Sequence, residues 1–240
     1  MINIKKRNKH LFLRKVCAFT LSEVLIAIAL IGVIAAIMVP QVVVTYKQQE
    51  TVELLKKAYS ELSQAVRLSE MENGPISTWN FKLSSKDFSE QYLRPFVKIN
   101  KSKAKYTTYR YLNGSIATSA IFKVAAKNGD ATDVFTTVGG ATYFIDAWYE
   151  EDMEHNIFAR GIGVDINGTG RKPNVIGRDF FYLMIDSEAG GVTTAFRNVK
   201  TRREILSNYC SKTQTHIDSS MGCAKLIQMD GYNINSDYPW

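Results

Sequence analysis

The chain has 240 residues, of which 45% are hydrophobic and 22% charged, and its formal net charge is +7 at pH 7. This length is enough for one globular domain with additional elements. The positive charge is local: residues 1–18 hold six Lys or Arg and no acid, and the other 24 basic residues nearly balance 23 acids. The near-neutral remainder argues against a surface for nucleic acid.

A long apolar segment follows this basic leader. Val24–Val39 are sixteen consecutive apolar residues, and the stretch reaches Val44 with only Pro40 and Gln41 interrupting it. As a helix, residues 24–44 extend about 31 Å, close to the 30 Å or so of a bilayer core. Basic residues beside a span stay on the cytoplasmic side. The pattern therefore predicts one membrane-spanning helix with a cytoplasmic leader.

Two simpler interpretations of the segment are a plain membrane anchor and a secretory signal peptide, with Ala35 and Ala36 near the cleavage site of the latter. Neither accounts for Glu23, which lies at the start of the apolar segment. Because a charge beside a membrane core is costly, an acid at this position requires a function.

The residues around Glu23 form a specific motif. Ala18 ends the basic leader, Phe19-Thr20-Leu21-Ser22-Glu23 follows, and the apolar segment comes directly after it. This arrangement resembles the N terminus of type IV prepilins and of type II secretion pseudopilins, although that family usually has Gly where this chain has Ala18. The match covers about the first quarter of the chain.

The resemblance implies a processing pathway. A membrane aspartic peptidase, the prepilin peptidase, would cut between Ala18 and Phe19 and would N-methylate the new amine of Phe19. The chain would then be a substrate of that peptidase and not an enzyme. Its expected partners are identical or homologous pilin subunits, an inner-membrane assembly platform and membrane lipid, with no specific nucleic acid. Its expected location is the bacterial inner membrane, single-pass with the head exported, and then a pilus or pseudopilus.

Glu23 is the expected assembly residue. It lies one turn inside the mature N terminus, where the helix dipole favours an anion. The amine of Phe19 on a neighbouring subunit would neutralise this carboxylate in an apolar bundle and would select one axial register. The alternative is an acid that only reaches towards the membrane surface.

The helical pattern continues beyond the membrane segment. Leu55, Tyr59, Leu62 and Val66 form an amphipathic stripe, and Asn73-Gly74-Pro75 is a helix stop. We therefore expect one helix from Phe19 to Glu72, with a kink or melted turn near Pro40. The stripe should pack against the chain's own head, the alternative being a free coiled coil. The expected regions are a leader (1–18), a membrane or filament-core helix (19–44), its amphipathic continuation (45–73) and an exported β-rich head (74–240).

Strand signals fill the head. A short helix is expected within Lys86–Phe96, whereas Lys98–Lys105 and the acidic run from Glu150 to Glu154 are expected to be solvated loops. Five runs of β-branched or aromatic residues are bounded by Gly, Asn or Asp: Val134–Val138, Thr142–Tyr149, Phe158–Ile166, Phe180–Asp186 and Val192–Arg197. Gly139-Gly140 and Ala189-Gly190-Gly191 are expected hairpin turns, so neighbouring strands should be antiparallel. The expected fold class is α+β and type IV pilin-like, a long N-terminal helix packed on a C-terminal antiparallel sheet.

The loop between the third and fourth of these runs is a candidate calcium site. Asp165 and Asn167 alternate before Gly168, and Asp179 follows. Calcium binds clustered carboxylate and amide oxygens, but an EF-hand is excluded because Ile176 stands where its twelfth residue should be Glu. Calcium at Asp165, Asn167 and Asp179 is plausible by resemblance to some pseudopilins. The alternative is a rigid turn whose side chains cap its own amides.

The cysteines are the last candidates. Cys17 belongs to the leader, which leaves Cys210 and Cys223 as a pair on the exported side, where disulfides persist. The alternative is a zinc pair with His216, for which a fourth ligand is not evident. A short helix is expected at Gly222–Ile227, and Tyr238 and Trp240 should pack the tail against the head.

No catalytic motif accompanies His10, His155 or His216. The sequence therefore favours a structural subunit of a type IV pilus or type II secretion pseudopilus. The second hypothesis is a membrane-anchored minor pilin-like module for adhesion or DNA uptake, and the third is a secreted hydrolase with an ordinary signal peptide.

Overall fold

The computed structural model describes residues 20–100, 107–118, 132–152, 154, 157–214, 216 and 218–240. The chain divides into two compact units, Met1–Thr45 and Tyr46–Trp240. The described part of the first unit is the apolar half of a long helix, and the second unit is the head.

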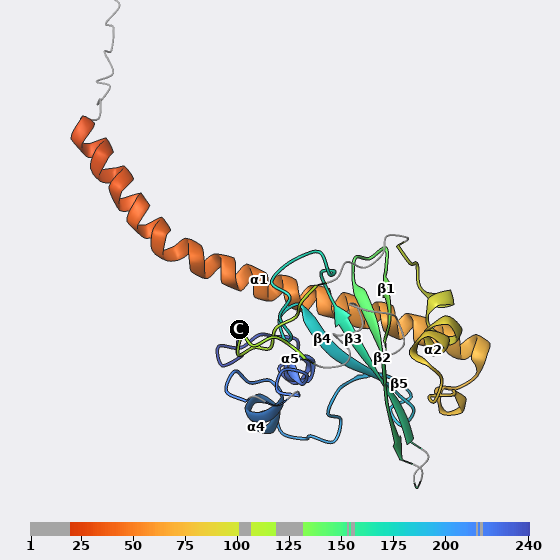
Figure 1. The fold of residues 1–240 in the computed structure, drawn as a ribbon. Coiled ribbons are helices and arrows are strands. Elements are labelled where there is room, and N and C mark those ends of the chain that lie inside the picture. Colours follow the sequence, from red (N-terminus) through yellow and green to blue (C-terminus); the bar gives the residue numbers. More distant parts are fainter. Residues whose placement is uncertain are drawn as a thin grey trace, which may run out of the picture. The chain divides into compact units, whose positions relative to one another are not determined.

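Helix α1 spans Leu21–Asn73, 53 residues, as the apolar and amphipathic patterns predict (Figure 1). It ends at Gly74, which has a φ of +81° and whose amide donates to the carbonyl of Glu70 at 3.0 Å. A left-handed residue favours glycine at this position. The helix is continuous through Pro40, so of the two expected effects of this proline, a kink or a melted turn, the melted turn is absent. Proline removes one backbone hydrogen bond, and the bonds on either side of it are enough to keep the segment helical.

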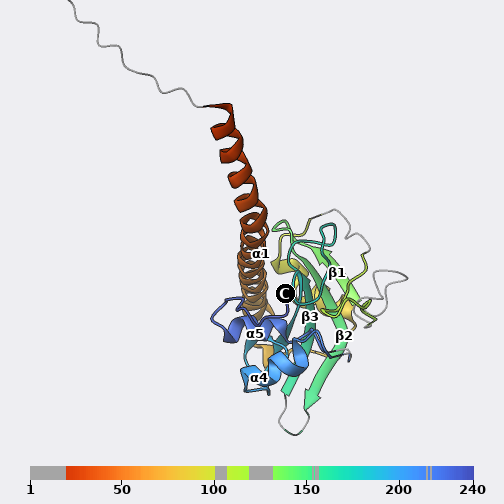
Figure 2. The same cartoon turned by 90° about the vertical axis from the view of Figure 1, so that its left-hand side faces the viewer.

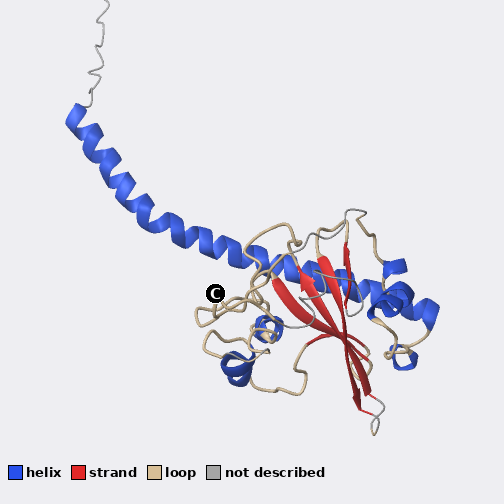
Figure 3. Ribbon diagram, in the orientation of Figure 1, coloured by secondary structure: helices blue, strands red, loops and turns tan. Residues whose placement is uncertain are grey.

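The head contains an antiparallel sheet (Figure 3). Its strands lie in the order β1-β2-β3-β4-β5. The strands are β1 (Thr132–Thr136), β2 (Thr142–Asp152), β3 (Ile157–Asp165), β4 (Phe180–Asp186) and β5 (Gly191–Thr194). All four pairings are antiparallel, and the β2–β3 register shifts between Ile145 and Tyr149. The two glycine turns lie between β1 and β2 and between β4 and β5, as expected. The α+β fold class with a long N-terminal helix is thus confirmed.

Three strands differ from the sequence-based expectation by more than one residue. Strand β1 lies two residues earlier than the expected Val134–Val138. Strand β2 continues to Asp152, so most of the acidic run is strand and not loop; the Glu151 carboxylate lies 2.8 Å from the Lys82 ammonium. Strand β5 stops at Thr194, because Phe196 has a φ of +62°, which no strand residue adopts.

The second half of α1 packs its apolar stripe against one face of the sheet. Its buried residues are Thr51, Val52, Leu55, Ala58, Leu62, Ala65, Val66 and Ser69. Five of them share one hydrophobic cluster with inward-facing residues of β2, β3 and β4: Val52, Leu55, Ala58, Leu62 and Val66. The hydroxyl of Tyr143 on β2 donates to the carbonyl of Ala58 at 2.9 Å. The stripe is therefore covered by the chain's own head, as predicted, and not by a coiled-coil partner.

Irregular segments cover the opposite face of the sheet, where Tyr109, Phe144, Phe180 and Met221 belong to a second hydrophobic cluster. Figure 2 shows the sheet from the side, with loops on the face turned away from the helix. Gly161 is required here, because a Cβ at that position would lie 1.8 Å from the hydroxyl oxygen of Tyr182.

Short helices complete the head: η1 (Ile76–Thr78), α2 (Ser85–Tyr92), η2 (Arg94–Phe96), α4 (Arg202–Glu204), the π-helical turn η3 (Ile205–Tyr209) and α5 (Cys223–Met229). Helices α2 and α5 lie where the sequence predicts them. The fully buried guanidinium of Arg160 fixes the segment before α2 by donating to the carbonyls of Phe81 and Leu83 at 2.5 and 2.9 Å.

Candidate functional site

The first half of α1 exposes an unusually large apolar surface. Fifteen large hydrophobic residues between Leu21 and Val44 are each 42–78% exposed. Among the described residues, α1 is the helix that is long and apolar enough to cross a membrane, and its most apolar window has no buried residue. A soluble protein rarely leaves such a patch uncovered. The segment therefore needs lipid or other apolar helices around it.

Glu23 and Thr20 form a reciprocal cap at the start of this helix. The backbone amide and the hydroxyl of Thr20 donate to Oε2 of Glu23 at 2.8 and 2.9 Å, and the Glu23 amide lies 3.3 Å from the Thr20 hydroxyl oxygen. This is a capping box, which satisfies amides that a helix start leaves without partners. The other carboxylate oxygen of Glu23, Oε1, accepts no hydrogen bond from the residues that the structure describes. Glu23 is thus held in place through one oxygen, and the other is left for a second donor.

The role of Thr20 was missed in the sequence, although Thr-Leu-Ser-Glu has the Thr-x-x-Glu spacing of a capping box. Replacing Thr20 by Ala should destabilise the first turn by about 1 kcal/mol, because a capping hydroxyl is lost. Hydrogen exchange of the backbone amides in the first turn, measured in micelles, should accelerate about five-fold. Thr20→Ser keeps the hydroxyl and should exchange like the original chain; equal exchange in both variants would contradict the capping role.

Several predicted sites lie outside the described residues. These are the leader with Cys17, the cleavage residues Ala18 and Phe19, the methylated amine of Phe19, and His155. Their assignments remain predictions.

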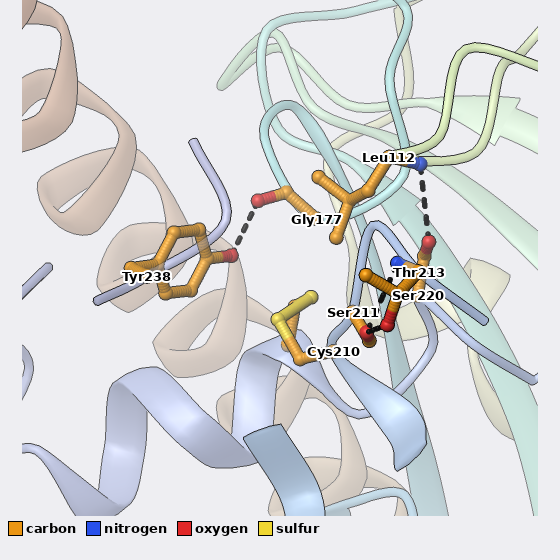
Figure 4. Close-up of a disulfide and its surroundings, with 8 residues drawn as sticks. Leu112, Gly177, Cys210, Ser211, Thr213, Ser220 and Tyr238 are labelled. Carbon is orange, nitrogen blue, oxygen red and sulfur yellow. Dashed lines mark hydrogen bonds between the residues drawn. A yellow bond between two sulfur atoms is a disulfide. The ribbon is translucent and has the colours of Figure 1, made fainter. Parts of the chain in front are cut away.

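Cys210 and Cys223 form a disulfide, as expected, so the zinc alternative with His216 is wrong (Figure 4). Both cysteines are fully buried. The bond joins the end of η3 to the start of α5, and a Cβ on Gly177 would approach the sulfur of Cys223 to 2.7 Å. The disulfide therefore lies directly against the loop between β3 and β4.

The C-terminal tail closes the same region. Tyr238 is buried and its hydroxyl donates to the carbonyl of Gly177 (Figure 4). Trp240 is partly buried, with the Arg178 guanidinium 5.5 Å from its ring centroid. The two aromatic residues pack the tail against the head, as predicted.

The candidate calcium residues do come together, in the loop between β3 and β4. Asp165 Oδ2 accepts from the hydroxyl of Tyr109 at 2.5 Å, and Oδ1 accepts from the Asn167 amide at 3.3 Å. Both oxygens of Asp179 accept backbone amides, from Asn174 at 2.5 Å and Val175 at 2.6 Å.

These bonds are those of a self-capped turn, since each carboxylate oxygen already has a donor from the protein. Within the described ranges, no group of three or more His, Cys, Asp or Glu is placed to hold a metal ion. Calcium takes six to eight oxygen ligands, and two carboxylates with one amide side chain supply only part of such a shell. The geometry favours the turn interpretation.

Burial changes the acidity of both carboxyl groups. It raises the pKa of Asp165 to about 7, reinforced by the nearby charge of Asp179 and opposed by the Tyr109 hydrogen bond. Burial likewise raises the pKa of Asp179 to about 6, opposed by the amides of Val175 and Asn174. In the unfolded chain both groups have pKa values near 4. The folded head therefore binds more protons than the unfolded chain between about pH 4 and pH 7.

It follows that stability from this pair is fully present at low pH and is lost as pH rises through that window. We expect the pair to lower the free energy of unfolding by about 2–4 kcal/mol between pH 5 and pH 8. Urea unfolding at both pH values checks this. Asp165→Asn should lose more than half of the pH dependence, and a variant as pH-sensitive as the original chain would contradict the assignment. A bound calcium ion would reverse the trend, so that 1 mM calcium chloride would stabilise the head at pH 8.

The model of a family described as "Family of unknown function (DUF6613)" matches residues 41–240, and the model of the prokaryotic N-terminal methylation motif matches residues 13–39. No curated protein and no solved structure shows significant similarity to the chain.

The methylation motif, the exposed apolar helix and the α+β head define a type IV pilin-like protein. One apolar N-terminal helix also fits a single-pass membrane anchor. Within that class, the chain belongs to the family of unknown function DUF6613, whose model covers most of its length.

Proposed function

We propose that the chain is a structural subunit of a type IV pilus or type II secretion pseudopilus. Prepilin peptidase cuts it between Ala18 and Phe19 and methylates the amine of Phe19. The subunit then assembles with identical or homologous pilin subunits, through its N-terminal helix, at an inner-membrane platform.

The uncovered apolar half of α1 carries this proposal. The hydrophobic clusters of the head begin at Val52 and include no residue of the first half of α1. The apolar segment is therefore not needed to complete the head's core. Removing this apolar surface from water is favourable by about 25 cal/mol per Å². The surface is first covered by lipid and later by the packed helices of other subunits.

The cap at Glu23 supports the assembly step. A carboxylate in the centre of a membrane helix costs about 2.5–3.5 kcal/mol on insertion scales, and less near the helix end. Two donors from Thr20 reduce that cost within one subunit, and Oε1 remains for the Phe19 amine of the next. The second charge neutralises the first only when the two helices are in one register.

The basic leader supports a cytoplasmic N terminus. Six Lys or Arg precede the apolar segment, so the N terminus stays in the cytoplasm and the head is exported across the bacterial inner membrane. An exported head also agrees with its disulfide.

Mass spectrometry of the N terminus tests the proposal. In cells with prepilin peptidase the mature chain should begin with N-methyl-Phe19, and in cells without the peptidase it should keep the leader. A chain cut near Ala35 or Ala36 would make the apolar segment a signal peptide and would overturn the proposal.

A minor pilin-like module that binds a target for adhesion or DNA uptake is the second candidate function. The observation that favours a binding role is a groove of about 450 Å³ on the head, between α1 and β5. Such a module needs the anchor but fewer contacts between helices, so it should tolerate loss of the Glu23 carboxylate.

A further inference from the structure

A groove runs between the head-bound half of α1 and the start of β5. One wall consists of α1 side chains from Tyr59 to Glu70, and the other of backbone and small side chains from Ala189 to Val192. Its volume of about 450 Å³ lies within the range of ligand-binding sites in proteins. Gly190 and Gly191 have no side chain to fill the groove, and the space beside both is open, because a Cβ at either position would have no atom within 4 Å.

The strand in this wall lies at the end of the sheet. Strand β5 pairs with β4 and is last in the strand order. The Tyr59 hydroxyl donates to the carbonyl of Val192 at 2.6 Å. Since carbonyls of an antiparallel strand point alternately to either side, this bond indicates that the Val192 carbonyl points away from β4, into the groove. The edge is therefore covered at this residue by one side chain and not by another strand.

The opposite wall is polar and carries a cation. Ser60, Ser63 and Gln64 offer hydrogen-bonding groups, and the exposed guanidinium of Arg67 makes no ion pair with any residue that the structure describes. The nearest acid along the helix, Glu70, instead accepts the amide of Ile76 at 3.1 Å. The groove therefore has an available donor for a carboxylate.

We propose that this groove binds an extended segment of a partner protein, which adds to the start of β5 in place of the Tyr59 hydroxyl and places a carboxylate against Arg67. An edge strand beside a helix is a geometry in which extended peptides bind by strand addition. Gly191 and Val192 are the residues of β5 that line the groove, so the partner pairs with the strand over about two residues. Backbone pairing gives affinity, and Arg67 selects an acid.

The test uses the full chain in detergent micelles, so that it does not depend on assembly. Random eight-residue peptides displayed on phage are selected against the protein, and the enriched sequence is labelled with fluorescein for anisotropy. The enriched peptides should contain Asp or Glu. Ser60→Trp, which fills the groove, should weaken binding at least ten-fold, and Arg67→Glu at least five-fold, with the preference moving to Lys.

Two further variants sharpen the result. Gln49→Trp places the same ring on an exposed position of α1 outside the groove and should bind like the original chain. Tyr59→Phe frees the Val192 carbonyl and should tighten binding two- to five-fold. Weaker binding in Tyr59→Phe would argue against strand addition at Val192, while thermal unfolding shows that each variant is folded.

Two outcomes overturn the proposal. In the first, no peptide is enriched above the level obtained with Ser60→Trp, or the enriched peptides bind Ser60→Trp and Arg67→Glu as well as the original chain. In the second, sedimentation shows that the chain self-associates through the groove, with Ser60→Trp monomeric, and that no peptide competes. The occupant would then be a second copy of this chain. Neither outcome affects the proposed assembly through the N-terminal helix.

Discussion

Replacing Glu23 by Ala should reduce the amount of this chain in sheared filaments or pseudopili at least ten-fold. In the proposed assembly, the variant loses the carboxylate that would pair with the Phe19 amine of a neighbouring subunit, so that amine would be buried without a counter-charge. Breaking a buried ion pair from one side costs about 3–5 kcal/mol, enough to prevent stable docking. Membrane insertion should be unaffected, because Ala is less costly than Glu in lipid.

Ser22→Ala is the matched control for that experiment. Ser22 lies beside the cap, with its hydroxyl 3.0 Å from that of Thr20, and it carries no charge. It should assemble normally. The two variants should be equally abundant in the membrane fraction. Normal assembly of Glu23→Ala would instead favour the anchored binding module.

Removing the disulfide should have the largest effect on the head. Cys210 and Cys223 close a loop with a sequence separation of 13, which corresponds to about 3 kcal/mol on the chain-entropy account. The bond also holds the surface on which Gly177 and Tyr238 pack. We expect Cys210→Ala with Cys223→Ala to lower the free energy of unfolding by about 3 kcal/mol and Tm by roughly 6–12 °C.

Urea unfolding of the full chain in micelles, followed by tryptophan fluorescence, measures this loss. Trp79 and Trp240 lie in the head and report on its packing. Reducing agent should destabilise the original chain by a similar amount and leave the double variant unchanged. Cys17→Ala, in the leader, is the control. A change below about 1 kcal/mol would show that the loop is held by packing alone.

The sequence predicted the elements that depend on local pattern. Apolar periodicity and the Asn73-Gly74-Pro75 stop placed α1 to within two residues at its start and one at its end, and the glycine turns placed two hairpins. The strand ends that the sequence predicted wrongly also have identifiable causes. Phe196 ends β5 because its backbone is left-handed, which an aromatic residue gives no reason to expect. The acidic run looked solvated, yet it is mostly strand because β3 pairs with it.

The candidate sites divide in the same way. The capping box lies within the four consecutive residues from Thr20 to Glu23. The sequence was therefore sufficient to predict it, although the prediction was not made. The sequence could not predict the hydrogen-bond partner of the buried Asp165 carboxylate. Tyr109 lies 56 residues from Asp165, and only the fold shows that its hydroxyl donates to that carboxylate.

By itself, the sequence determined a basic leader, a specific motif at Ala18–Glu23 and an apolar helix, because charge, hydropathy and helical spacing act between near neighbours. The tertiary structure confirmed that the amphipathic half of α1 is covered by its own sheet. It alone shows that burial raises the pKa of Asp165 to about 7 and the pKa of Asp179 to about 6, and that a groove lies beside β5. Burial and desolvation are set by residues distant in the chain, and no local pattern specifies them.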